Sequence, residues 1–188
     1  MRVEKLKEAF EVETVLVHFP LHPETPLEGS SMAENYAARG LDPEAMYARM
    51  KGLMDAEGLP YERRTHTYNS RLAQELGKWA DTQPGGPLGP GALHDALYKA
   101  YFVAARNIGD PDILIEIAGS VGLPVEEARA VLEERRFKDA VDADWAKSHQ
   151  YGVTGVPTFV AGRYGVVGAQ PYEVLEQLVE KAGAPRRT

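Results

Sequence analysis

The residues of this chain that could take part in chemistry gather around one proline near the C-terminal end. Pro157 follows Gly152, Thr154, Gly155 and Val156, at the point where a run of strand-forming residues begins. Proline cannot donate to a strand ladder, so a proline at the start of a strand marks an edge or a special turn. A cis bond before it would leave the N–H and C=O of Val156 facing outward, as a short edge to which an extended peptide or glutathione can pair. The alternative is an ordinary trans proline that follows a turn.

The second chemical feature is an absence, because the sequence contains no cysteine. The chain as given therefore has no disulfide, no thiolate metal site and no cysteine nucleophile. His18 and His22 flank Phe19-Pro20, but no carboxylate or third histidine stands at ligand spacing from them. We accordingly expect no metal site and no catalytic residue, and we look for binding residues instead.

Composition limits the class of protein. With 188 residues, of which 44% are hydrophobic, the chain suits one compact domain with room for an inserted subdomain. A formal net charge of −7 makes nucleic acid an unsuitable partner, because phosphate contacts need clustered Lys and Arg. No run approaches the roughly 20 apolar residues of a membrane helix. The charged N-terminal residues do not resemble a signal peptide, so we expect a cytoplasmic protein.

Apolar spacing and turn residues predict the elements that must position Pro157. The predicted order is helix, strand, helical block, hairpin and helix, at residues 1–10, 14–19, 42–149, 157–167 and from 171 onward. The run at 14–19 is β-branched and apolar, which is typical of a buried strand. Strands near both ends with helices between them predict an α/β protein rather than a helical bundle.

Several segments together resemble a known family. The stretch from Gly152 to Val160, with Gly168-Ala169-Gln170-Pro171 behind it, closely resembles the C-terminal segment of DsbA-family oxidoreductases of the FrnE type. In that family this segment is the cis-proline loop, the β-hairpin and the start of the last helix. Three further segments agree in order, so that the resemblance spans nearly the whole chain: His18–Pro23, Asn69–Ala73 and Tyr101–Pro111.

The resemblance implies an α/β, thioredoxin-like fold with an inserted all-helical subdomain. We expect the thioredoxin-like domain at residues 1–40 and 136–188 and the insert at 41–135. The implied ligand is an extended polypeptide, a dithiol or a glutathione-like molecule. The implied substrate-binding residues are Phe19, Asn69, Thr154, Gly155, Val156, Pro157 and Gln170. For Asn69 a second role, as the N-cap of a helix, is equally open.

The family begins with a strand that leads into Cys-x-x-Cys at the start of the first helix, where the helix dipole lowers the thiol pKa. Met1 falls inside that helix, so the resemblance implies that the first strand and both cysteines are missing here. Either the gene model starts at an internal methionine, which we favour, or the protein has lost its redox centre. In this fold the lost strand is central, and each unpaired ladder group it leaves costs about 1–3 kcal/mol. We therefore expect a homodimer or segment exchange that covers the open sheet.

Three functions stay open. The first is a homologue of thiol–disulfide oxidoreductases that is redox-silent as given and keeps its cis-proline substrate-binding loop, without a cofactor. The second is a glutathione-dependent isomerase or transferase resembling the 2-hydroxychromene-2-carboxylate isomerases, which use serine in place of cysteine and take glutathione. The third is a non-catalytic peptide-binding module. The codons upstream of Met1 distinguish them, as Cys-x-x-Cys, serine or an in-frame stop.

Overall fold

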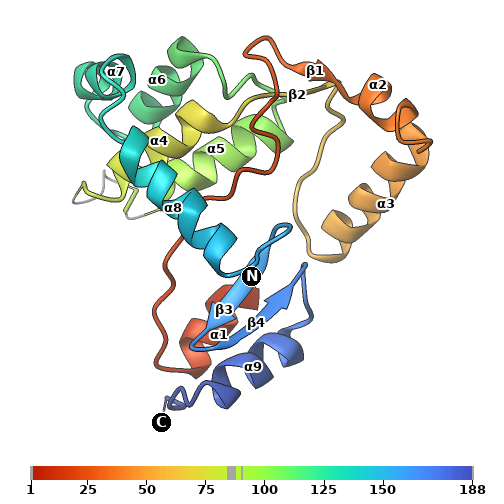
Figure 1. Cartoon of the computed structure of the whole chain (residues 1–188), viewed down its shortest axis with the longest axis vertical. Coiled ribbons are helices and arrows are strands. Elements are labelled where there is room, and N and C mark those ends of the chain that lie inside the picture. Colours follow the sequence, from red (N-terminus) through yellow and green to blue (C-terminus); the bar gives the residue numbers. More distant parts are fainter. Residues whose placement is uncertain (1, 84–87, 90, 188) are drawn as a thin grey trace. The chain divides into compact units, whose positions relative to one another are not determined.

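The chain folds into two compact units, and the computed structural model describes residues 2–83, 88–89 and 91–187 of it (Figure 1). The discontinuous unit comprises Met1–Leu21 and Ala143–Thr188. The inserted unit, His22–Asp142, lies between those two stretches in the chain. The limits therefore fall at 21/22 and 142/143, whereas the sequence predicts them at 40/41 and 135/136. Residue 1, with which the predicted first helix begins, lies outside the described residues.

The discontinuous unit combines a β-hairpin with helices from both ends of the chain (Figure 1). Its elements are α1 (Arg2–Ala9), the last turns of α8 (Lys138–Gln150), β3 (Thr158–Ala161), β4 (Tyr164–Val167) and α9 (Tyr172–Lys181). The two strands pair antiparallel, with Ala161 opposite Tyr164 across the Gly162-Arg163 turn. The hairpin predicted from the sequence is thereby confirmed.

The core of the discontinuous unit lies between α1 and α9. Leu6 and the fully buried Phe10 pack against Leu175 and Val179. Beyond α1 the chain pairs with the C-terminal tail, through a single antiparallel bridge from Phe10 to Arg186. The first helix and the last helix therefore share one packed body, which supports the hairpin beside them.

The prediction of a buried strand at residues 14–19 is wrong. In the described part of the chain this segment is extended but pairs with no strand, and Figure 1 shows it as a coil. Val15, Leu16 and Val17 are 74%, 53% and 37% exposed. β-branched residues favour a strand only where a neighbour supplies a ladder and a surface to pack on, and no described strand supplies either. One contact that holds the segment is the bond from the N–H of His18 to Oδ2 of Asp144, at 3.1 Å.

The inserted unit is mostly helical. Its helices are α2 (Met32–Ala37), α3 (Pro43–Ala56), α4 (Arg71–Ala80), α5 (Ala92–Phe102), α6 (Pro111–Ser120), α7 (Val125–Glu133) and the first turn of α8. Asp42 and Asp110 cap α3 and α6, each followed by proline at the first helical position. The core lies among α4 to α7, where Leu76, Trp79 and Leu114 are at most 1% exposed.

The insert differs from the all-helical subdomain that the resemblance implies, because it contains a short strand pair. β1 (Ser30–Ser31) runs antiparallel to β2 (His66–Thr67). The N–H of Met32 also donates to the C=O of Thr65 at 2.9 Å. These backbone bonds join the two ends of the segment that carries α2 and α3.

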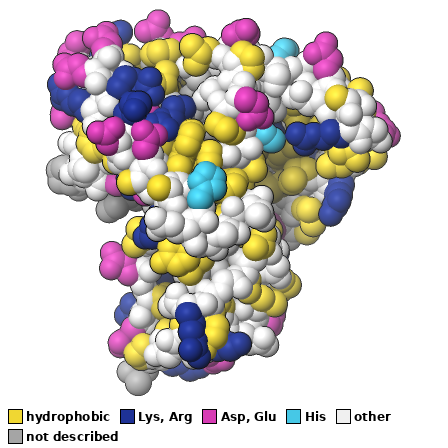
Figure 2. All heavy atoms as spheres, viewed as in Figure 1, with side chains coloured by type: hydrophobic (Ala, Val, Ile, Leu, Met, Phe, Trp, Pro, Cys, Tyr) yellow, Lys and Arg dark blue, Asp and Glu magenta, His cyan; other side chains and the backbone are white. Residues whose placement is uncertain are grey.

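No helix among the described residues is long and apolar enough to cross a bilayer. On the face drawn in Figure 2, the side chains of Lys and Arg lie among those of Asp and Glu, with apolar side chains between them.

Candidate functional site

The candidate site begins where α8 ends. Gly152 has a φ of +67°, which glycine adopts without the steric cost of a Cβ. Its N–H donates to the C=O of His149 at 2.9 Å, and the N–H of Val153 donates to the C=O of Ser148 at 3.0 Å. These two bonds form a Schellman motif, which closes the helix and turns the chain into the loop.

The loop presents one residue with unpaired backbone groups. The Val156–Pro157 peptide bond is cis, the isomer that the resemblance implies. Within the described part of the chain, neither the N–H nor the C=O of Val156 has a hydrogen-bond partner, and the residue is 51% exposed. The neighbouring carbonyls are used internally: that of Pro157 accepts from the N–H of Gly168 at 2.7 Å, and that of Gly155 accepts from the hydroxyl of Thr158 at 2.7 Å. Val156 thus offers one donor and one acceptor.

Gln170 supports this loop from the far end of the hairpin. Its Nε2 donates to the C=O of Val167 at 2.6 Å, and its N–H donates to the C=O of Gly168 at 2.8 Å. Arg2 donates from Nη1 to the C=O of Gln170 at 2.8 Å. Because Gly168 in turn holds the carbonyl of Pro157, the structure gives Gln170 a positioning role. A direct contact between Gln170 and a ligand stays a prediction.

The loop can recognise a ligand through backbone hydrogen bonds rather than through charge. Residues 152–159 carry no ionisable side chain, and Thr154 adds only an exposed hydroxyl. A pocket of about 590 Å³ lies along the preceding turns of α8, lined by Ala143, Ala146, Lys147, Gln150 and Tyr151. Among the described residues, no three His, Asp or Glu side chains gather as a metal ion would require.

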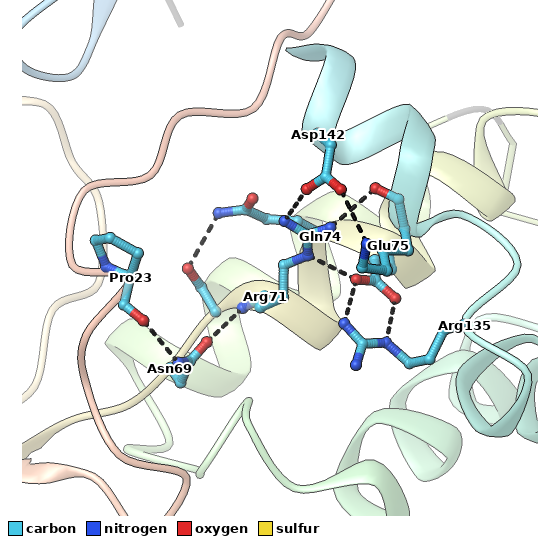
Figure 3. Close-up of polar contacts among 9 residues, drawn as sticks. Pro23, Asn69, Arg71, Gln74, Glu75, Arg135 and Asp142 are labelled. Carbon is cyan, nitrogen blue, oxygen red and sulfur yellow. Dashed lines mark hydrogen bonds and ion pairs between the residues drawn. The ribbon is translucent and has the colours of Figure 1, made fainter. Parts of the chain in front are cut away.

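The two remaining predicted site residues, Phe19 and Asn69, belong to different units. Phe19 is half-buried in the discontinuous unit, at the end of the extended segment. Asn69, in the inserted unit, caps the start of α4, since its Oδ1 accepts from the N–H of Arg71 at 2.9 Å (Figure 3). Its Nδ2 donates to the C=O of Thr25 at 2.7 Å and of Pro23 at 3.4 Å. The structure therefore shows the capping role, and the ligand-binding role of Asn69 stays a prediction.

Sequence reasoning missed a buried ionic network on α4 (Figure 3). Glu75 is fully buried, and its carboxylate accepts from Nε and Nη2 of Arg135 at 2.7 and 2.6 Å and from Nε of Arg71 at 2.6 Å. Burial alone would raise the pKa of Glu75, but the bonds from Arg135 and Arg71 outweigh it and hold the pKa below its ordinary value. A signal was present in the sequence, because Glu75 stands beside Leu76 on the apolar face that the pattern assigns to this helix.

A second missed group is Asp144, on the part of α8 that belongs to the discontinuous unit. Only 9% of the residue is exposed, and its carboxylate accepts from the N–H of His18. The two residues are far apart in the sequence, so no local pattern could have linked them.

Comparison with known proteins places this arrangement in a family. The model of the DSBA-like thioredoxin domain matches residues 1–180, and the chain belongs to that family. The probable DsbA oxidoreductase SCO1869 from Streptomyces coelicolor has a similar crystal structure, with a TM-score of 0.86 and 34% identity. That match covers 97% of this chain and 82% of SCO1869.

Two further matches are more limited. The uncharacterized protein YwbO from Bacillus subtilis (strain 168) is 35% identical over 86 residues, which is 44% of this chain and 42% of YwbO. A candidate protein disulfide isomerase from Nitrosomonas europaea has 19% identity and a TM-score of 0.60, over 75% of this chain and 74% of its own, and shows likeness of fold alone. The chain is thus a mostly helical α/β member of the DsbA-like thioredoxin family with a helical insert, and it contains no cysteine.

Proposed function

We propose that this DsbA-like chain binds an extended polypeptide at the Val156–Pro157 loop and, as given, carries out no thiol–disulfide exchange. The observation that carries the proposal is the unpaired N–H and C=O of the exposed Val156. The absence of cysteine supports the second half, because disulfide exchange proceeds by thiolate attack.

Binding follows the logic of strand addition. The N–H of Val156 donates to a carbonyl of the ligand, and its C=O accepts an N–H from the same ligand residue. Each such bond contributes about 0.5–1.5 kcal/mol net, so the pair alone gives weak and sequence-tolerant binding. Side-chain burial against the exposed Val156 must supply the rest, and we expect dissociation constants in about the millimolar to high micromolar range.

The polypeptide proposal is better supported than the glutathione alternative. SCO1869, at 34% identity over 97% of this chain, is described as a probable DsbA oxidoreductase. Asn69, which the glutathione alternative would place at the pocket, donates and accepts within the chain itself. The bonds that hold the Val156 loop, by contrast, involve only main-chain groups and the neutral side chains of Thr158 and Gln170.

Three synthetic peptides test whether a ligand pairs with Val156. One is an apolar hexapeptide with blocked ends; its analogues are N-methylated at alternate residues, which removes the N–H groups from one edge. We expect titration of the 188-residue chain to shift the Val156 amide resonance and to slow its hydrogen exchange. Methylation of the pairing edge should weaken binding about fivefold to tenfold, and methylation of the opposite edge should leave it unchanged. Equal binding of all peptides, or a response that bypasses Val156, contradicts the proposal.

An insulin assay tests the redox half separately. With dithiothreitol as the reductant, we expect the 188-residue chain to leave the rate of insulin precipitation at that of the buffer control. A rate above the control would contradict the redox-silent assignment and would leave peptide binding at Val156 untouched.

A further inference from the structure

Arg64, in the inserted unit, is stacked on two aromatic rings without an anionic partner. Its guanidinium carbon lies 4.1 Å from the ring centroid of Tyr101 and 4.8 Å from that of Phe102. The two rings meet at 70°, with centroids 4.8 Å apart, so Arg64 contacts both rings of an edge-to-face pair. Within the described residues, Nε and Nη1 of Arg64 are buried and have no hydrogen-bond acceptor.

Two other arginines that stack on aromatic rings show what is missing at Arg64. Arg63 stacks on Tyr47 and is also held by both carboxylate oxygens of Glu44. Arg186 stacks on Phe10 and pairs with two glutamates of α9. A ring face satisfies the charge of a guanidinium from one side but leaves its N–H edges in need of an acceptor. In the described part of the chain, Arg64 has the rings and lacks the carboxylate.

The surrounding backbone holds Arg64 in place before any ligand arrives. The N–H of Glu62 donates to the C=O of Phe102 at 3.0 Å, which fixes the segment to the end of α5. On the other side, the C=O of Thr65 accepts from Met32, and the strand pair of β2 follows. A cation fixed in this way loses little freedom when it binds, which favours affinity.

We propose that Arg64 is the binding residue of a site for a carboxylate ligand on the platform of Tyr101 and Phe102. Nη2 is not among the buried nitrogens that lack a partner, and it forms a fork with Nε on one edge of the guanidinium and with Nη1 on another. Because Nε and Nη1 are buried, a ligand first reaches the guanidinium at Nη2. A planar carboxylate fits such a fork. The charge balance selects a monoanion over a phosphate dianion, because Glu44 already neutralises the neighbouring Arg63 and one positive charge is available.

Two peptides on the unmodified 188-residue chain give the first test. A five-residue peptide with blocked ends carries a single internal Glu, and its matched analogue carries Gln. We expect the Glu peptide to bind about tenfold or more tightly in calorimetry, because charge-assisted hydrogen bonds are roughly twice as strong as neutral ones. Equal affinity of the two peptides overturns the proposal without the use of any variant.

Variants locate the effect. Arg64→Gln should abolish the preference for the Glu peptide, and Arg64→Lys should keep only part of it, because a single ammonium has no fork. Arg163→Gln is the matched control: that arginine stacks on Tyr164 at 5.2 Å but already donates to the hydroxyl of the same residue. A preference that survives Arg64→Gln, in a variant whose circular dichroism matches the wild type, overturns the proposal.

Two small ligands complete the design. N-acetylglycine is a free monoanionic carboxylate, and equal or tighter binding than the Glu peptide supports the site and assigns it to small molecules. Weaker binding than the peptide, again lost in Arg64→Gln, supports the site and assigns it to protein-borne carboxylates. Inorganic phosphate that displaces the Glu peptide more effectively than N-acetylglycine contradicts the choice of a carboxylate.

Discussion

Replacement of Glu75 by glutamine tests the most deeply buried charge of the chain. The change keeps the shape of the side chain but removes the anion that Arg135 and Arg71 surround (Figure 3). Removal of one partner from a buried ion pair costs about 3–5 kcal/mol, because the other charge stays behind. Here the cost is reduced, since the side chain of Arg135 is 42% exposed and Arg71 keeps its ion pair with Asp142 at 2.7 Å. We therefore expect a loss of about 3 kcal/mol in the free energy of unfolding.

Urea unfolding followed by fluorescence measures this loss, with Trp79 as a reporter on the same helix. For a domain of this size the expected loss corresponds to a fall in Tm of about 6–12 °C. Glu134→Gln is the matched control, because Glu134 is 59% exposed and its ion pair with Arg136 is screened by solvent. If Glu75→Gln is no more destabilising than Glu134→Gln, the network does not stabilise the fold as argued.

The pH dependence provides an independent check of the same residue. The pKa of Glu75 is lowered in the folded chain, so the contribution of its carboxylate to stability is fully present above the ordinary glutamate pKa of the unfolded chain. The contribution is lost as the pH falls through the lower, folded pKa. The stability difference between wild type and Glu75→Gln should accordingly be constant near neutral pH and shrink below about pH 4.5. A difference that grows on acidification would refute the assignment.

Substitutions at three further positions test the cap of α4, the contact that holds residues 14–19 and the expected dimer. Asn69→Ala removes the acceptor for the N–H of Arg71 and should cost about 1–2 kcal/mol in urea unfolding, whereas Asn69→Asp should keep the cap and lose less. Asp144→Ala removes the acceptor for the N–H of His18, so amide exchange at His18 should become faster while unfolding of the inserted unit is unchanged. We propose that a second copy covers the exposed segment at residues 14–19, and light scattering should show a dimer that Val15→Lys weakens, because a charge on this segment opposes pairing.

Each of these tests has an outcome that contradicts it. Asn69→Ala with wild-type stability would remove the case for a cap. Unchanged exchange at His18 would show that Asp144 does not hold the extended segment. If light scattering shows the wild-type chain to be monomeric at a concentration of about 100 micromolar, the expected homodimer is refuted.

The sequence predicts elements that depend on neighbouring residues, and it does not predict elements that depend on a distant partner. Helix starts at Asp42-Pro43 and Asp110-Pro111 were predictable, because the cap and the proline act within one turn. The hairpin around Gly162-Arg163 was predictable for the same reason. The strand at residues 14–19 was not, since a strand exists only with a partner and propensity reports nothing about the partner.

The difference between local and non-local signals also explains which features of the candidate site and of the Glu75 network the sequence could not predict. Spacing alone could not choose the isomer of the Val156–Pro157 bond, because most X-Pro bonds are trans, and family resemblance supplied the choice. An Arg and a Glu four residues apart, such as Arg71 and Glu75, most often form a weak surface pair. The structure shows that Glu75 is fully buried and that the distant Arg135 donates to both of its carboxylate oxygens.

The conformation of the Val156 loop does not depend on the presence of a thiol. The hydrogen bonds that hold the loop join Gly168 to Pro157, Thr158 to Gly155 and, in support, Gln170 to the hairpin. None of these groups is ionisable or redox-active, so the edge at Val156 keeps its form whether or not a thiol is nearby. In a DsbA-like chain, binding of the polypeptide can therefore persist without exchange. An activity assay alone would miss the polypeptide binding that we propose, whereas a binding assay at Val156 would test it.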